Sequence, residues 1–163
     1  MEIIDNFLKR EEFNELQALM MLNNNLPWYY NDRVVRANNN PDEFQFTHNF
    51  YKGYQPHSPY YINLNPIILK LKPKAIIRIK ANLLARTPKI IQFPLHVDFN
   101  YIESPFTTSI FYLNTNNGHT IFEDGTKVES VANRMIIFPG DMSHTGTTCT
   151  DEQIRVVINF DYF

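Results

Sequence analysis

The feature that most restricts the fold is a series of short β-type segments in the second half of the chain. They are rich in Ile, Val, Phe and Tyr, which favour strands, and Pro, Gly, Asn and Asp interrupt them. Many short strands at this spacing, preceded by helices, indicate a mainly β fold with a helical flank, and we expect a jelly roll. The expected strands are 75–85, 91–98, 107–114, 119–122, 127–131, 135–138 and 154–160.

The first 73 residues are more varied. We expect a short strand over 2–8, a helix over 10–21 and a helical segment over 65–71. The stretch 29–60 is polar and irregular, with one strand near 44–51, which is typical of a binding loop or lid. No repeat or Gly/Ser-rich linker divides the chain. The prediction is one domain, with flanking helices, strands and a variable loop over 1–73 and a jelly-roll core over 74–163.

Charge and cysteine content exclude several classes of protein. The net charge of −2 gives no field that would attract nucleic acid. The single cysteine, Cys149, allows no internal disulfide and no iron–sulfur or zinc–thiolate site, and we expect a buried, inert thiol. The first residues show no secretory signal, and no apolar run could span a membrane. We expect a cytoplasmic protein without a membrane partner.

Three residues could form a metal site. His96 and Asp98 lie two apart on an expected strand, so both side chains would point to the same face. His144 follows in a turn after the 135–138 segment. Each residue alone is typical of an ordinary surface position, but two histidines and one carboxylate form the facial set of non-haem Fe(II). That set leaves positions open for a chelating co-substrate and dioxygen, whereas structural zinc would need a closed tetrahedral set.

Arg155 begins the apolar 154–160 segment, where a buried guanidinium is costly unless a negative group meets it. A guanidinium pairs well with a carboxylate through two parallel hydrogen bonds. The partner could be an internal Asp or Glu, or a diacid ligand. Together with His96, Asp98 and His144, a diacid ligand accounts for the pattern better.

The order His-x-Asp, then a distal His, then an Arg resembles the 2-oxoglutarate- and Fe(II)-dependent dioxygenases, particularly the prolyl 4-hydroxylase-like group. The resemblance covers most of the chain, and the stretch 29–60 matches least. It implies a double-stranded β-helix of jelly-roll type. The segments that carry it, besides the four site residues, are 3–8, 107–114, 118–122 and 133–138.

By this resemblance the protein would use Fe(II), 2-oxoglutarate and O2 to hydroxylate an unactivated C–H bond. His96, Asp98 and His144 would hold the iron at the catalytic centre. Arg155 would bind the distal carboxylate of 2-oxoglutarate, and the hydroxyl of Tyr112 would meet the same carboxylate. Tyr112 alone could equally be a core tyrosine.

The resemblance also implies secondary positions. Asn82 lies where related enzymes place an amide near the C1 carboxylate of 2-oxoglutarate. Two residues on, Leu84 stands where many prolyl hydroxylases have a tyrosine, and this departure bears on both the C1-side contacts and the prolyl substrate. Asn159 shares a strand face with Arg155, so it is either a polar residue of the co-substrate pocket or a satisfied core amide.

The substrate has several candidates. A peptidyl residue comes first, and the alternatives are a free small molecule or a nucleobase, although the charge disfavours nucleic acid. A different class is a cupin-like metal-binding module without turnover. The partner is therefore expected to be a protein or small-molecule substrate. The remaining histidines, His48, His57 and His119, are expected to be surface or loop residues.

The stretch from Lys70 to Lys89 carries lysines and arginines but no acidic residue. Strand alternation puts Arg78, Lys80 and Asn82 on one face. This is either a solvated basic face or a basic lip that attracts an anionic substrate to the cavity mouth.

Overall fold

The computed structural model describes residues 1–34 and 43–163, so part of the stretch predicted to be irregular lies outside the described residues. The helices are α1 (Arg10–Gln17), extended by a π-helical turn over Ala18–Leu22, and α2 (Asn65–Leu71), preceded by a 3-10 helix over Pro59–Leu64. Both predicted helical segments are confirmed. No helix in the described part of the chain is long and apolar enough to span a membrane.

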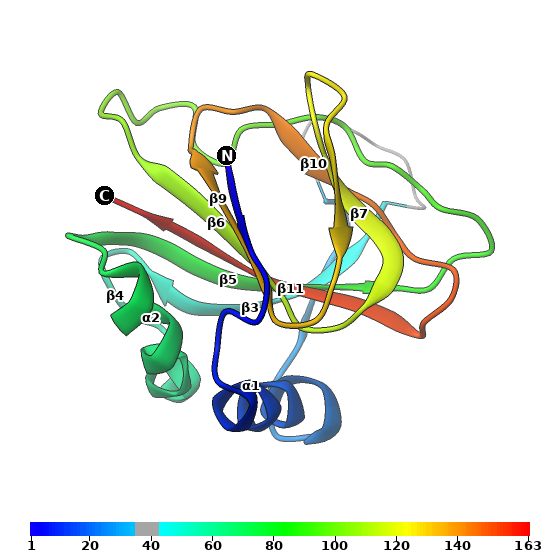
Figure 1. The fold of residues 1–163 in the computed structure, drawn as a ribbon, viewed down its shortest axis with the longest axis horizontal. Coiled ribbons are helices and arrows are strands. Elements are labelled where there is room, and N and C mark those ends of the chain that lie inside the picture. The colour runs from blue at the N-terminus through cyan, green and yellow to red at the C-terminus, as the bar shows by residue number, and fades with distance from the viewer. Residues whose placement is uncertain (35–42) are drawn as a thin grey trace.

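The strands form a large and a small sheet, both antiparallel, as in a jelly roll of the double-stranded β-helix type (Figure 1). The order in the large sheet is β1-β9-β6-β11-β5-β3-β2, with β4 paired to β3, and in the small sheet it is β10-β7-β8. The predicted mainly β jelly roll is therefore confirmed. The strands of the large sheet are β1 (Glu2–Ile4), β2 (Tyr29–Asn31), β3 (Gln45–Lys52), β4 (Gln55–Pro56), β5 (Ile76–Ala85), β6 (Thr107–Tyr112), β9 (Arg134–Pro139) and β11 (Ile154–Tyr162). Those of the small sheet are β7 (Asn116–Phe122), β8 (Lys127–Ser130) and β10 (His144–Gly146).

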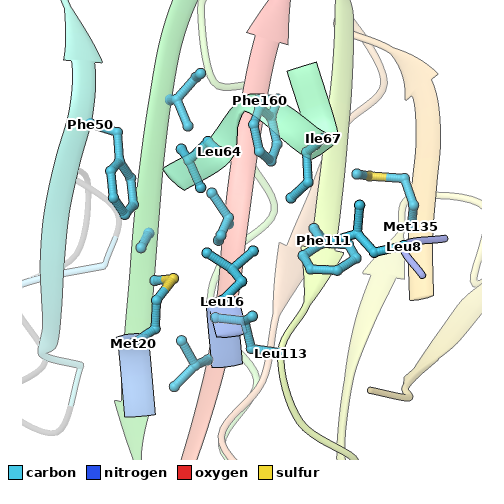
Figure 2. Packing of buried hydrophobic residues seen from close by; sticks show 14 of the residues in the cluster. Leu8, Leu16, Met20, Phe50, Leu64, Ile67, Phe111, Leu113, Met135 and Phe160 are labelled. Carbon is cyan, nitrogen blue, oxygen red and sulfur yellow. The ribbon is translucent and has the colours of Figure 1, made fainter. Parts of the chain in front are cut away.

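The main hydrophobic core lies between the helices and one face of the large sheet. Phe13, Leu16 and Ile67 of the helices pack against Phe111 and Phe160 of the strands (Figure 2). Burying aromatic and branched side chains of this size contributes about 1.5–3 kcal/mol each. This layer fixes the large sheet, so its other face can carry polar groups.

The opposite face of the large sheet meets the small sheet. A second, smaller core there joins Ile110, Ile136 and Val157 of the large sheet to Phe122 and Val128 of the small one. Figure 1 shows α1 and α2 on one side of the large sheet and β7 and β10 on the other.

Alternation along β11 and β5 separates these two environments. Val156, Ile158 and Phe160 face the helices, and the residues between them face the small sheet. The antiparallel register then pairs polar residues across the two strands. The pairs on this face are Arg155 with Leu84, Val157 with Asn82, Asn159 with Lys80 and Asp161 with Arg78.

The segment 91–98 is not the regular strand that was predicted. It makes only two isolated bridges, from Gln92 to Thr147 and from His96 to His144. Pro94 lies between the bridges, and a proline nitrogen cannot donate to a strand ladder. The same-face argument for His96 and Asp98 therefore does not hold as stated.

Two turn predictions were also wrong. His144, expected in a turn, begins β10 and pairs with Phe122 of β7. The Asn116–Gly118 segment, whose Asn and Gly residues were expected to separate the strands 107–114 and 119–122, begins β7, and its register against β8 shifts between Asn116 and His119. An irregularity of this kind bends a strand without ending it, so turn-forming residues can lie within one.

Candidate active site

A cavity opens between the two sheets and collects most of the predicted site residues. Residues from β5, β6 and β11 of the large sheet and from β7 and β10 of the small sheet line it. Tyr112 lies fully buried beside it, and its hydroxyl donates a hydrogen bond of 2.7 Å to Oγ1 of the lining residue Thr120. The predicted residues that line the cavity are His96, Asp98, His144, Arg155, Asn82 and Asn159.

The two candidate ligand histidines are held side by side by their backbones. The amide of His96 donates to the carbonyl of His144, and the amide of His144 donates to the carbonyl of His96, each at 3.0 Å. Their ring centroids are 5.2 Å apart. A doubly hydrogen-bonded antiparallel pair is thus what brings residues from distant parts of the sequence together.

Both imidazoles are oriented in the same way. Nδ1 of His144 lies 3.0 Å from the carbonyl oxygen of Met142, and Nδ1 of His96 lies 3.3 Å from that of Pro94. A carbonyl only accepts, so each Nδ1 donates and each Nε2 keeps a lone pair. Burial also lowers the pKa of His96, which favours its neutral form. Metal-binding histidines commonly have this arrangement, because the second hydrogen bond fixes the ring.

The two carboxylate oxygens of Asp98 have different neighbours. Its Oδ1 accepts a hydrogen bond of 2.5 Å from Nη2 of Arg78. Its Oδ2 is buried, has no hydrogen-bond partner in the described structure, and lies 3.8 Å from Nε2 of His144. Burial opposes the charge, but Arg78 and Lys80 hold the pKa of this carboxyl well below its usual range.

These donors fit a divalent metal ion in kind and in direction. Oδ2 of Asp98 and Nε2 of His144 are two acceptors that face each other, which only a cation or a proton between them makes favourable. Adjacent ligands of one ion lie about 3 Å apart at metal–ligand distances near 2.1 Å. As they stand, no three His, Cys, Asp or Glu side chains in residues 1–34 and 43–163 are close enough to hold an ion. Closing the 3.8 Å gap requires a movement of less than about 1 Å.

Arg155 is buried in the cavity wall without a carboxylate. Its Nε donates to Oγ of Ser130 at 2.9 Å and its Nη2 to Oγ1 of Thr120 at 3.3 Å. No ion pair to it occurs in the described parts of the chain, so the internal Asp or Glu partner considered from the sequence is not found there. Burial lowers the pKa of Arg155, although a guanidinium stays charged at any ordinary pH. This cation therefore needs an anion.

Comparison with known proteins bears on the fold. No family model matches the sequence, and no curated protein is significantly similar to it. Among solved structures, an oxidoreductase of the 2OG-Fe(II) oxygenase family from Burkholderia pseudomallei has a TM-score of 0.69 at 13% identity, covering 98% of this chain and 83% of its own. This chain has the 2OG-Fe(II) oxygenase fold.

Two prolyl hydroxylases share this oxygenase fold. The enzyme from Trichoplax adhaerens, solved with a hypoxia inducible factor peptide fragment, has a TM-score of 0.67 at 15% identity, covering 99% of this chain and 82% of its own. The viral collagen prolyl hydroxylase of Paramecium Bursaria Chlorella virus-1, in its 2OG complex, has a TM-score of 0.65 at 13% identity, with coverage of 99% and 94%. The likeness therefore extends over nearly the whole chain.

The secondary positions predicted from the oxygenase resemblance lie on one face of β5 and β11. Nδ2 of Asn82 donates to Oδ1 of Asn159 at 3.3 Å, so Asn159 lines the cavity and is partly satisfied there. Leu84 also lines the cavity, opposite Arg155. A leucine offers no donor at the position where a tyrosine was expected.

Arg78 is the functional residue that sequence reasoning misplaced. It was expected on a solvated basic face or on a basic lip at the cavity mouth, but its Nη2 lies 2.5 Å from Oδ1 of Asp98 and 2.8 Å from Oδ2 of Asp161. Its guanidinium also stacks over Phe99, 4.6 Å from the ring centroid. Alternation gave the correct strand face but could not give these partners. Arg78 is thus committed to two buried carboxylates and is not part of a basic lip.

The other polar residues are outside the site. His48 is buried and bonded to Pro27 and Ser58, so the expectation of a surface histidine was wrong for it. His57 is exposed and His119 half-buried. Cys149 is buried and free, as expected.

Proposed function

We propose that this protein is a 2-oxoglutarate- and Fe(II)-dependent dioxygenase that hydroxylates its substrate. One observation carries the proposal: a buried, unpartnered Asp98 oxygen faces Nε2 of His144 in the same cavity as Arg155, which has no carboxylate partner in the described residues. A cation would stabilise the facing Asp98 and His144 acceptors, and an anion would pair with Arg155. Fe(II) with 2-oxoglutarate satisfies both.

His96, Asp98 and His144 would hold the iron through Nε2, Oδ2 and Nε2. A bound Fe(II) supplies the chemistry that oxidises 2-oxoglutarate to succinate and CO2 with O2 and hydroxylates a C–H bond. The chain's own share is to orient these ligands. The Nδ1 contacts to Met142 and Pro94 fix the two rings, and Arg78 occupies the second oxygen of Asp98.

Arg155 would bind the distal carboxylate of 2-oxoglutarate. Ser130 and Thr120 fix the guanidinium plane through Nε and Nη2, while Nη1 makes no hydrogen bond within the described residues. Nη1 lies against Gly146, and a Cβ added to that glycine would be 3.3 Å from Nη1. The Tyr112 hydroxyl is bonded to Thr120, and the centroid of its ring lies 5.7 Å from the guanidinium carbon of Arg155, so we assign it a positioning role in place of the direct contact predicted.

We favour a peptidyl residue as the substrate, because two of the fold neighbours are prolyl hydroxylases and one was solved with a peptide fragment. Leu84 departs from the prolyl hydroxylase pattern, so the proposal does not specify proline. A free small molecule or a nucleobase would use the same cavity. Function in a reducing cytoplasm suits an Fe(II) site and a free thiol.

The test is turnover of 2-oxoglutarate. Protein supplied with Fe(II), air and 2-oxoglutarate should release succinate, and mixtures of peptides, metabolites and nucleosides should contain a species that gains one oxygen atom. Asp98→Ala should abolish both signals. Wild-type protein that shows neither signal with any mixture would contradict the proposal.

A further inference from the structure

The cavity contains a second cation that the proposed function does not use. Lys80 lines the cavity together with His96, Asp98 and Arg155. In the described parts of the chain it makes no ion pair and no hydrogen bond. Arg78, its neighbour on the same strand face, is instead paired with both Asp98 and Asp161. Asp98 and Asp161 lie near enough to favour its charge, but its own N–H donors meet no acceptor in the described residues. A buried donor without an acceptor is costly unless a ligand meets it.

The register places Lys80 away from Arg155. On β5 and β11, Leu84 is opposite Arg155 and Lys80 is opposite Asn159, so the two cations start four residues apart along the sheet. At the rise of a strand this is about 13 Å between their backbones. Asp98 lies near the Lys80 end through Arg78, and Gly146, two residues after His144, lies near Arg155. Along this strand face Lys80 therefore lies between Arg78, which holds Asp98, and the position opposite Arg155.

A polar neighbour completes the surroundings of Lys80. Asn159 uses its Oδ1 to accept from Asn82, and its Nδ2 makes no hydrogen bond in the described residues. Lys80 and Asn159 thus offer an ammonium and an amide donor from paired positions on one strand face. Donors of this kind are what a carboxylate needs. Burial lowers the pKa of Lys80 to about 8, so the ammonium form still predominates at neutral pH.

We propose that Lys80, with the amide of Asn159, forms a second carboxylate-binding subsite in this cavity, four residues along the sheet from Arg155. The inference rests on the proposed function and adds a residue to it. The carboxylate has two possible sources. One is the C1 carboxylate of 2-oxoglutarate, and the other is a carboxylate of the primary substrate.

Two probes, 2-oxoglutarate itself and levulinate, distinguish the binding of its two carboxylates. Levulinate keeps the keto group and the distal carboxylate but carries a methyl group in place of the C1 carboxylate. Both probes are titrated calorimetrically into Mn(II)-loaded wild type, Lys80→Met and Arg155→Met. Lys74→Met, on the exposed surface outside the cavity, is the matched control. Urea midpoints show that each variant is folded.

Arg155→Met should weaken the binding of both probes. If it weakens the binding of neither, the proposed function fails independently of Lys80. Loss of a charged hydrogen bond corresponds to roughly a 10- to 150-fold weaker affinity. If Lys80→Met weakens the binding of 2-oxoglutarate by this factor and leaves the binding of levulinate unchanged, the subsite binds the C1 carboxylate.

If Lys80→Met binds 2-oxoglutarate normally, acetate is titrated into the 2-oxoglutarate-saturated protein and followed by NMR. Acetate binding to wild type and to Lys74→Met, but not to Lys80→Met, assigns the subsite to a substrate carboxylate. If Lys80→Met matches wild type in both titrations, the subsite does not exist.

Discussion

Arg78 donates a 2.5 Å hydrogen bond to Oδ1 of Asp98, the carboxylate whose other oxygen faces His144. Nε of the same guanidinium donates to Oδ2 of Asp161 at 3.0 Å, and Asp161 in turn accepts from Thr108. Burial and the nearby Asp98 charge raise the pKa of Asp161 to about 7. One guanidinium thus pairs with two buried carboxyl groups and leaves Asp98 a single free oxygen.

Arg78→Met should therefore destabilise the fold strongly. Removing one partner from a buried ion pair typically costs about 3–5 kcal/mol, because the remaining charges stay buried. The free energy of unfolding in urea measures this loss. Adding Asp161→Asn should recover part of it by removing one carboxylate. Arg33→Met, which removes a surface pair with Asp32, should change stability little. Equal effects of the two single variants would show that Arg78 is not a buried structural cation.

His96→Ala and His144→Ala should each lose metal affinity. In an anaerobic Fe(II) titration, wild type should bind one ion, and metal at 100 times its dissociation constant should add about 2.7 kcal/mol of stability. Chelator should reverse that gain. His48→Ala is the control, because His48 is buried outside the cavity. Wild-type affinity in both ligand variants would exclude the proposed iron site.

Arg155→Met should raise the requirement for 2-oxoglutarate and leave Fe(II) binding intact. Loss of a buried charged partner costs about 2–5 kcal/mol, which is roughly a 30- to several-thousand-fold weaker affinity. Equilibrium binding of 2-oxoglutarate measures it. Arg134→Met, which breaks a pair with Asp5 at the surface, should leave the affinity unchanged. An unaltered affinity in Arg155→Met would make Arg155 purely structural.

Gly118→Ala should disturb the end of the cavity that contains Arg155. A Cβ there would lie 2.7 Å from Cδ of Arg155 and 2.8 Å from the carbonyl oxygen of Thr148. Overpacking of this kind costs about 1–3 kcal/mol, and the displaced Arg155 should bind 2-oxoglutarate less well. Gly53→Ala controls for backbone strain, because Gly53 has a φ of +63° and no atom within 4 Å of its would-be Cβ. Normal 2-oxoglutarate binding by Gly118→Ala would contradict the tight packing.

The sequence predicted those parts of the site that depend on periodicity. Alternation along β5 and β11 put Asn82 and Lys80 on one face and Asn159 with Arg155 on one face, because strand side chains repeat every two residues whatever the partners are. The resemblance supplied His144 and Arg155 as members of one set. Both kinds of information survive errors in the exact strand bounds.

The sequence could not predict the contacts that depend on pairing between distant segments. His96 meets His144 through an isolated bridge, since Pro94 prevents the regular strand that was expected. Arg78 finds its partners 20 and 83 residues away, at Asp98 and Asp161. Alternation shows the face of a strand but not the loop that covers it, so Arg78 was expected on a solvated basic face or a basic lip and not in a buried ion pair.

His48 should make the fold less stable in mild acid. Its Nδ1 donates to the carbonyl oxygen of Pro27 at 2.7 Å, so in the neutral ring its Nε2 accepts from Oγ of Ser58 at 2.8 Å, and this second bond needs the neutral ring. Burial lowers the pKa of His48, so below about pH 6.5 the unfolded chain binds a proton that the folded chain resists. The free energy of unfolding should then decrease as the pH is lowered, and this group contributes at most about 1.4 kcal/mol per pH unit to the decrease. His48→Gln should be less stable than wild type at pH 8, and the difference should shrink towards pH 5. Parallel curves for wild type and His48→Gln, measured by urea unfolding between pH 5 and 8, would show that the ring is not held neutral.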